Sequence, residues 1–300
     1  MTLGTIKLND GNEMPVMAFG TGTKWRGKGD ITDGVIQAIE TGFDHLDSAQ
    51  AYGTEPYVGR ALRECGLSRN EFFITTKWSG LSPMEEAIRS SLDNMGIKQV
   101  DLYLVHMPSL LKDIEHDWAA FEKIKEAGLT KSIGVSNFTL EDMQKLLKVA
   151  RTKPAVNQIF LNPYTYAQNK ELIEYSRQNG ILTEAYSALI SLSWWRGGHV
   201  DKPVEAAARR LNASPAQVLL LWMRSKGVAV VTTSASKEHL EDYLAIANLP
   251  PLTEDEIAAI DEAGAKGPPK RILVKLRENA SLVLAVLFLH VVFFAYRFLL

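Results

Sequence analysis

Cysteine is almost absent from this 300-residue sequence, and so is an excess of charge of either sign. The single cysteine, Cys65, excludes a disulfide within the chain and suits a reducing compartment. The formal net charge of −2 argues against nucleic acid as a partner, because no surplus of Lys and Arg is available to neutralise phosphates. Residues 1–15 contain no apolar signal-peptide core, so we expect no secretory leader.

Two further absences limit the chemistry. Gly20-Thr-Gly22 follows an apolar run, but no third glycine follows at the spacing of a dinucleotide-binding fingerprint, and the next helical pattern starts too late. This argues against a doubly wound nucleotide-binding fold. We also predict no bound metal, because no metal-ligand spacing is found among His45, His116, His199, His239 and His290.

What the sequence does contain is a regular alternation of short apolar runs and helical patterns. Hydrophobic residues make up 46% of the chain, enough for a sizeable core. Strands are predicted at 16–19, 44–47, 72–77, 101–106, 132–135, 155–159, 181–185 and 228–232. The helices that follow them are predicted at 32–40, 54–65, 83–95, 114–127, 139–150, 168–179, 202–211 and 237–247. Eight such units over about 250 residues predict an α/β fold of the (β/α)8 TIM-barrel type, whereas a doubly wound sheet would fit fewer units.

Local signals mark the ends of these elements. Residues 4–16 are typical of a hairpin that turns at Asp10-Gly11. Helices are expected to begin at Thr54, Ser82-Pro83, Thr139 and Ser214-Pro215, and to end at Gly96, Gly128 and Gly180. Residues 214–226 form an additional helix, and 253–267 a last one with capping-box spacing from Thr253 to Glu256. The barrel is therefore expected to occupy residues 1–265.

Four chemically suitable residues lie at or just beyond neighbouring strand ends. Asp47 ends the second predicted strand, Tyr52 follows in the next loop, and Lys77 and His106 end the third and fourth strands. Carboxyl-terminal strand ends of a barrel meet at one mouth, so we expect these side chains to converge. Such a set suits reduction of a carbonyl by hydride, because negative charge builds on the oxygen and a proton donor must be present there.

Tyr52 is the candidate proton donor. A neighbouring Lys77 ammonium would lower the pKa of the phenol, and Asp47 would keep Lys77 charged and oriented. His106 would donate a hydrogen bond that positions the carbonyl oxygen. The hydride itself must come from a cofactor, because no side chain supplies one.

Several segments resemble the aldo-keto reductase family in family order. They are GFDHLDSAQAYGTEPYVG at 42–59, FFITTKW at 72–78, DLYLVHMP at 101–108, KSIGVSNF at 131–138, PAVNQIFLNPY at 154–164, AYS at 185–187 and SPAQVLLLW at 214–222. Asp44 stands where the family usually has arginine. The resemblance implies NADPH-dependent reduction of an aldehyde or ketone with Tyr52 as general acid. NADPH is favoured over NADH.

The resemblance also implies cofactor contacts. Ser136, Asn137 and Gln158 would bind the nicotinamide amide, and Tyr186 would stack on its ring. Ser187 and Leu189 would line the pyrophosphate, although Ala188 and Ile190 replace the family's proline and glycine. Ser234, Lys237 and His239 lie in the stretch that would hold the 2′-phosphate, where the family's usual lysine and arginine are missing. Thr23 and Asp47 complete the predicted set.

The predicted substrate pocket is aromatic. It comprises Trp25, Trp78, Trp194 and Trp195, with Met107 where the family commonly has tryptophan. These residues imply a small apolar carbonyl substrate. A competing hypothesis is a cofactor-binding regulatory or redox-sensor subunit with little turnover. Reduction of a C=C bond is disfavoured, because by family precedent an acid would replace His106.

The last 21 residues, 280–300, are the one long apolar stretch. As a helix they would span roughly 31 Å at about 1.5 Å per residue, which matches a bilayer core. We expect a C-terminal transmembrane anchor, inserted after translation and preceded by a basic linker at 266–279, with packing onto the barrel or a dimer seam as the alternatives. The basic residues before the segment place the barrel in the cytosol, on the endoplasmic reticulum or outer mitochondrial membrane.

Overall fold

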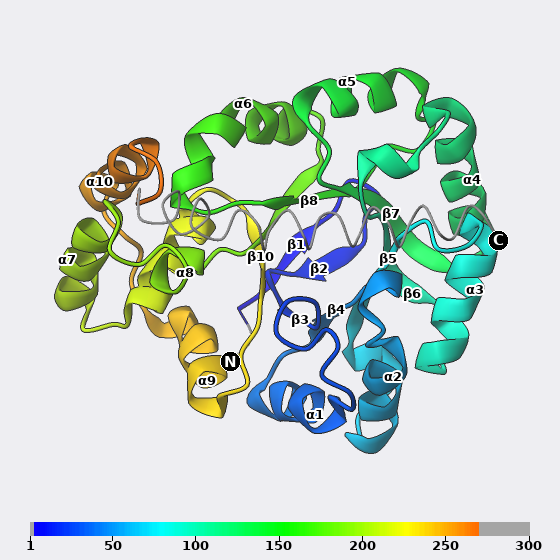
Figure 1. Cartoon of the computed structure of the whole chain (residues 1–300), viewed down its shortest axis with the longest axis horizontal. Coiled ribbons are helices and arrows are strands. Elements are labelled where there is room, and N and C mark those ends of the chain that lie inside the picture. Colours follow the sequence, from blue (N-terminus) through cyan, green and yellow to red (C-terminus); the bar gives the residue numbers. More distant parts are fainter. Residues whose placement is uncertain (1–2, 270–300) are drawn as a thin grey trace, which may run out of the picture.

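The computed structural model describes residues 3–269 and shows the expected closed parallel barrel (Figure 1). Its strands are β3 (Met17–Gly20), β4 (His45–Asp47), β5 (Phe73–Trp78), β6 (Val100–Val105), β7 (Thr130–Ser136), β8 (Val156–Phe160), β9 (Leu182–Tyr186) and β10 (Ala229–Thr232). They follow one another around the barrel in chain order, and β10 closes it by pairing in parallel with β3. All eight predicted strands are confirmed within a few residues.

The helices form a ring outside these strands (Figure 1). They are α1 (Thr32–Thr41), α2 (Glu55–Glu64), α3 (Met84–Met95), α4 (Ile114–Glu126), α5 (Leu140–Val149), α6 (Pro163–Gln178), α7 (Asp201–Leu211), α8 (Pro215–Ser225), α9 (Lys237–Leu244) and α10 (Glu254–Ala265). Short 3-10 turns are η1 (Gln50–Tyr52), η2 (Arg69–Glu71), η3 (Pro108–Leu110), η4 (Ile190–Leu192) and η5 (Ala245–Asn248). The additional helix is confirmed, because α7 and α8 both lie between β9 and β10.

A two-stranded hairpin closes one end of the barrel. Strands β1 (Thr5–Lys7) and β2 (Glu13–Pro15) pair antiparallel and lie across the barrel in Figure 1. Leu8 and Met14 from this hairpin pack in one cluster with inward-facing Leu102 and Leu104 of β6. The hairpin therefore fills the barrel's amino-terminal end with apolar side chains, and the polar site lies at the opposite end.

Most predicted helix ends are confirmed. Thr139, Ser214 and Thr253 each form a capping box, in which the hydroxyl accepts from the third helical residue's backbone N–H. Gly96 ends α3 in the left-handed region at φ 67°, which glycine adopts without a Cβ clash.

Two expected helix starts differ from the structure. Thr54 occupies the residue before α2, but its hydroxyl bonds Thr21 at 2.8 Å and Ser48 at 2.9 Å instead of capping the helix. Helix α6 begins at Pro163 rather than at 168, because the Asn162 side chain accepts from the Tyr164 N–H and caps an earlier turn.

The predicted membrane anchor at 280–300 and most of the basic linker at 266–279 lie outside the described residues. Within 3–269, no helix combines the length and apolarity that a membrane crossing requires.

Candidate active site

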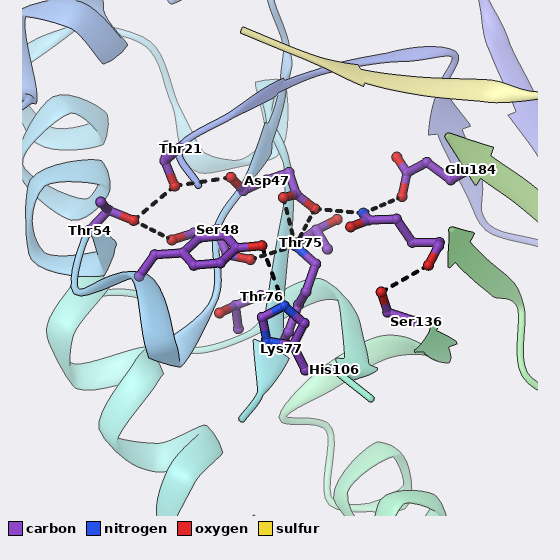
Figure 2. Close-up of polar contacts among 12 residues, drawn as sticks. Thr21, Asp47, Ser48, Thr54, Thr75, Thr76, Lys77, His106, Ser136 and Glu184 are labelled. Atoms are coloured by element: carbon purple, nitrogen blue, oxygen red, sulfur yellow. Dashed lines mark hydrogen bonds and ion pairs between the residues drawn. The ribbon is translucent and has the colours of Figure 1, made fainter. Parts of the chain in front are cut away.

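A buried ion pair lies at the carboxyl end of the barrel strands. Lys77 donates through Nζ to both oxygens of Asp47, at 2.6 and 2.7 Å, and to the Ser48 carbonyl at 2.8 Å (Figure 2). Lys77 is fully buried and Asp47 is 2% exposed. All three Lys77 protons therefore have acceptors, which is the condition for keeping an ammonium inside a protein.

Tyr52 and His106 lie above this pair, as the sequence predicted. The Tyr52 hydroxyl is 3.4 Å from His106 Nε2, and Lys77 Nζ is 5.3 Å from the centre of the Tyr52 ring. Gly22 allows this arrangement, because a Cβ there would come within 2.9 Å of the Tyr52 ring. Two strand ends and two loops thus bring an acid, an ammonium, a phenol and an imidazole together.

The protonation states follow from burial and from Lys77. Burial raises the pKa of Tyr52, and the Lys77 ammonium opposes this without reversing it. The expected lowering of the phenol's pKa is therefore wrong in direction, because the loss of solvent outweighs the nearby charge. Burial, then Lys77, lowers the pKa of His106 to about 4, so the imidazole is neutral near pH 7. Burial alone would lower the pKa of Lys77, but Asp47 and Tyr52 raise it.

A second carboxylate approaches the pair from β9. Gln158 donates through Nε2 to Asp47 Oδ2 at 2.9 Å and to Glu184 Oε2 at 2.7 Å. Glu184 is fully buried, and burial followed by the charge of Asp47 raises its pKa to about 7. Because both Nε2 protons of Gln158 are used, its amide oxygen is the atom left to accept a hydrogen bond from a group in the cavity.

A cavity of about 1150 Å³ opens over these residues. The predicted site residues that line it are Thr23, Asp47, Tyr52, His106, Ser136, Asn137, Gln158, Tyr186, Ser187, Leu189, Trp194, Ser234 and His239. The Tyr186 hydroxyl donates to Asn137 Oδ1 at 2.8 Å, which fixes both side chains at the rim of β7 and β9. Asn137 and Ser187 have φ of 62° and 60°, in the left-handed region that few non-glycine residues adopt.

Other predicted site residues lie away from the cavity lining. Trp78 is buried against Phe121 of α4, and Trp195 packs edge-on against Phe160 and Tyr164. Trp25 donates from its indole to Thr233 Oγ1 at 3.0 Å. Met107 and Lys237 are exposed, and neither is among the residues that line the cavity. Of the five predicted pocket residues, Trp194 alone lines it.

The sequence interpretation missed several lining residues. Lys24, Arg26, Arg196 and Asp242 reach the cavity from loops and from α9. Charged residues in loops resemble ordinary solvent-exposed residues in a sequence, so no pattern identified them. Glu184 did carry a signal, since it is the one acid within the apolar run of β9.

Comparison with known proteins accounts for this arrangement. The sequence profile described as "Aldo/keto reductase family" matches residues 16–265. The chain belongs to the aldo/keto reductase family. It is 35% identical to the NADPH-dependent alpha-keto amide reductase of Saccharomyces cerevisiae, over 88% of this chain and 92% of the relative. It is 37% identical to the NAD/NADP-dependent indole-3-acetaldehyde reductase of Schizosaccharomyces pombe, over 86% and 93%.

Solved aldo/keto reductase structures share the fold. An aldo/keto reductase from Brucella melitensis superimposes with a TM-score of 0.77 at 32% identity, covering 86% of this chain and 98% of that one. A metagenomic member, MGS-M4, gives a TM-score of 0.78 at 31% identity, covering 86% and 94%. This aldo/keto reductase is accordingly an oxidoreductase acting on carbonyl groups or the corresponding alcohols, and its nicotinamide cofactor follows from family membership.

Proposed function

We propose that this aldo/keto reductase uses NADPH to reduce an aldehyde or ketone to the alcohol, with Tyr52 as the general acid. The observation that carries the proposal is the position of the Tyr52 hydroxyl. It faces the cavity beside neutral His106, and its ring lies beside the buried Lys77–Asp47 pair.

The residues present fit a nicotinamide. Gln158 lines the cavity, and its amide oxygen accepts no hydrogen bond from residues 3–269, which makes it a suitable acceptor for a carboxamide N–H. The Tyr186 ring lies in the same cavity and offers an aromatic face. When bound, the nicotinamide supplies the hydride that no side chain supplies.

Side chains of the protein would then stabilise the charge on the carbonyl oxygen and supply its proton. As negative charge builds on the carbonyl oxygen, Tyr52 donates its proton to that oxygen, and the phenolate that remains is stabilised by Lys77. Asp47 holds Lys77 in place through two hydrogen bonds. His106, being neutral, supplies one N–H to the same oxygen without competing with Tyr52 for the proton.

The choice between NADPH and NADH is argued from two relatives and from the residues near α9. The S. cerevisiae relative is named NADPH-dependent, whereas the S. pombe relative is named for both nucleotides. Ser234 and His239 line the cavity, and Lys237 at the start of α9 lies nearby in sequence. We assign the 2′-phosphate to these residues.

The substrate is proposed to be a small apolar carbonyl compound, because Ile190, Leu192 and Trp194 are among the residues that line the cavity. Incubation of purified protein with NADPH or NADH and a panel of aldehydes and ketones tests the proposal directly. Oxidation of the nucleotide with formation of the alcohol supports it. Tight nucleotide binding without turnover on any panel member would favour the regulatory-subunit alternative.

We also propose that residues 280–300 anchor the protein to a membrane of the endoplasmic reticulum or mitochondrial surface, with the barrel in the cytosol. The support is the sequence alone, an apolar stretch preceded by Lys266, Lys270, Arg271, Lys275 and Arg277.

A further inference from the structure

Ser79 contacts the back of the His106 ring. It follows β5 directly, and its Oγ lies 2.8 Å from His106 Nδ1. The backbone N–H of Ala51 donates to the same Oγ at 3.3 Å, and the N–H of Ser79 donates to Gln50 Oε1 at 3.2 Å. Ser79 is thus held between η1, which carries Tyr52, and His106, and it is not among the residues that line the cavity.

The hydrogen bonds at Ser79 favour one of the two neutral tautomers of His106. A neutral imidazole has one N–H and one lone pair, and a hydroxyl has one proton. Ala51 already donates to Ser79 Oγ, and the hydroxyl's own proton is available to an acceptor. Among the described residues, His106 Nδ1 is the acceptor within hydrogen-bond distance. Donation from Ser79 to Nδ1 gives each of these groups a partner, and it leaves the ring proton on Nε2.

Nε2 is the ring nitrogen next to the proposed proton donor, Tyr52. It lies 3.4 Å from the Tyr52 hydroxyl, and both residues line the cavity. With the proton there, His106 donates toward an oxygen that gains negative charge. In the other tautomer a lone pair would face the same oxygen and repel it.

We propose that Ser79 is a positioning residue that holds His106 in its Nε2–H tautomer, so that the imidazole donates a hydrogen bond to the oxygen that Tyr52 protonates. The proposal rests on the proposed function for its catalytic consequence, but not for the tautomer itself.

The tautomer is measured by long-range proton–nitrogen NMR on protein labelled with 15N-histidine. The chain has six histidines, and loss of one signal in His106→Gln assigns the ring. We expect a neutral ring protonated on Nε2 in the unmodified protein and in Ser79→Thr, which keeps the hydroxyl. Ser79→Ala is expected to show a mixture of tautomers. An Nδ1–H ring in the unmodified protein, or an unchanged ring in Ser79→Ala, would overturn the proposal.

Kinetics give the second readout. Ser79→Ala should lower kcat for carbonyl reduction, by less than the roughly 10²–10³-fold that loss of a direct oxyanion donor costs, while the affinity for nucleotide stays unchanged. Ser79→Thr should restore most of the rate. Ser82→Ala is the matched control, because Ser82 Oγ accepts from the same Gln50 side chain at 3.1 Å. Equal kcat losses in Ser79→Ala and Ser82→Ala would contradict a role through His106. If neither the unmodified protein nor any variant reduces a carbonyl compound, the proposed function is wrong. The NMR experiment still tests the tautomer of His106 in that case.

Discussion

Lys77 Nζ lies 2.6 and 2.7 Å from the two carboxylate oxygens of Asp47, across the pairing of neighbouring strands β5 and β4. Lys77 is fully buried, and Asp47 is 2% exposed. Each charge is tolerable there only because the other is present, since an unpaired buried ion has a large desolvation cost. The pair therefore links the stability of the barrel to the chemistry at its mouth.

Lys77→Met should destabilise the fold as well as abolish activity. The substitution leaves the Asp47 carboxylate buried without a cation, and breaking such a pair typically costs about 3–5 kcal/mol. Urea unfolding monitored by tryptophan fluorescence measures the loss. The double variant Asp47→Asn, Lys77→Met removes both charges and should lose less stability than Lys77→Met alone. A single variant as stable as the unmodified protein would show that the carboxylate finds another partner.

Tyr52→Phe should remove turnover and leave the site otherwise intact. The variant lacks only the hydroxyl, and general acid catalysis typically contributes roughly 10²–10⁴-fold. Nucleotide affinity, measured by fluorescence titration, should stay near that of the unmodified protein. Retention of more than about a tenth of the original rate would remove Tyr52 from the role of proton donor.

His45 should make the protein sensitive to mild acid. It is fully buried with Nε2 2.8 Å from Thr75 Oγ1, and burial lowers its pKa from 6.5 to about 4. The unfolded chain takes up a proton on this histidine near pH 6.5, whereas the folded protein takes it up only near pH 4. The free energy of unfolding is therefore unaffected by His45 above pH 6.5 and decreases as the pH falls from 6.5 toward 4. The decrease in the free energy of unfolding should approach about 2 kcal/mol at pH 5, since each pH unit below 6.5 contributes about 1.36 kcal/mol.

The test compares unfolding free energies of the unmodified protein and His45→Gln at pH 7 and pH 5. Other groups also titrate in this range. His106 shares the direction of the effect, whereas the raised pKa of Glu184 makes stability fall as pH rises from 4.5 to about 7. The difference between the two proteins isolates His45 because these groups are common to both. Parallel pH profiles would rule out a contribution from His45.

Lys237→Ala should weaken NADPH binding far more than NADH binding if the lysine meets the 2′-phosphate. A charge-assisted contact is worth about 1.5–3 kcal/mol, or roughly a tenfold to hundredfold change in affinity. The exposed side chain must turn toward the cavity to make it, and His239→Ala is the informative companion because His239 already lines the cavity. Equal effects of Lys237→Ala on both nucleotides would contradict the assignment.

The barrel and its polar end could be predicted because both follow from local patterns. Alternating apolar strands and capped helices specify the eight units, and parallel strands bring Asp47, Lys77 and His106 to one end whatever the details of packing. Side chains alternate along a strand, so the inward direction of Lys77 also implies that Trp78 points outward, where it packs on Phe121. Alternation along the strand thus predicts from the sequence that Trp78 lies outside the substrate pocket.

The remaining features depend on contacts between distant segments. The Thr54 hydroxyl bonds Thr21 and Ser48 rather than capping α2, and Gln158 joins Asp47 to Glu184 across the barrel. No local spacing encodes these partners. The direction of the Tyr52 pKa shift was mispredicted for the same reason, because burial depends on the assembled barrel and outweighs the neighbouring ammonium.

Removal of residues 280–300 should convert a membrane-bound protein into a soluble one. The stretch from Ala280 to Tyr296 contains no Asp, Glu, Lys, Arg, Asn or Gln, with His290 as its one titratable side chain besides Tyr296, and a span of about 20 predominantly apolar residues partitions into a bilayer. The full-length protein should sediment with membranes and resist carbonate extraction, and its barrel should be digested by protease added outside intact organelles. A form ending at Asn279 should remain in the supernatant with unchanged kcat, since every residue of the proposed site lies before it.

A third form, with Leu284 and Leu287 replaced by Lys, keeps the length of the segment but makes it less apolar, and it should also stay soluble. Full-length protein that remains in the high-speed supernatant without detergent would overturn the anchor.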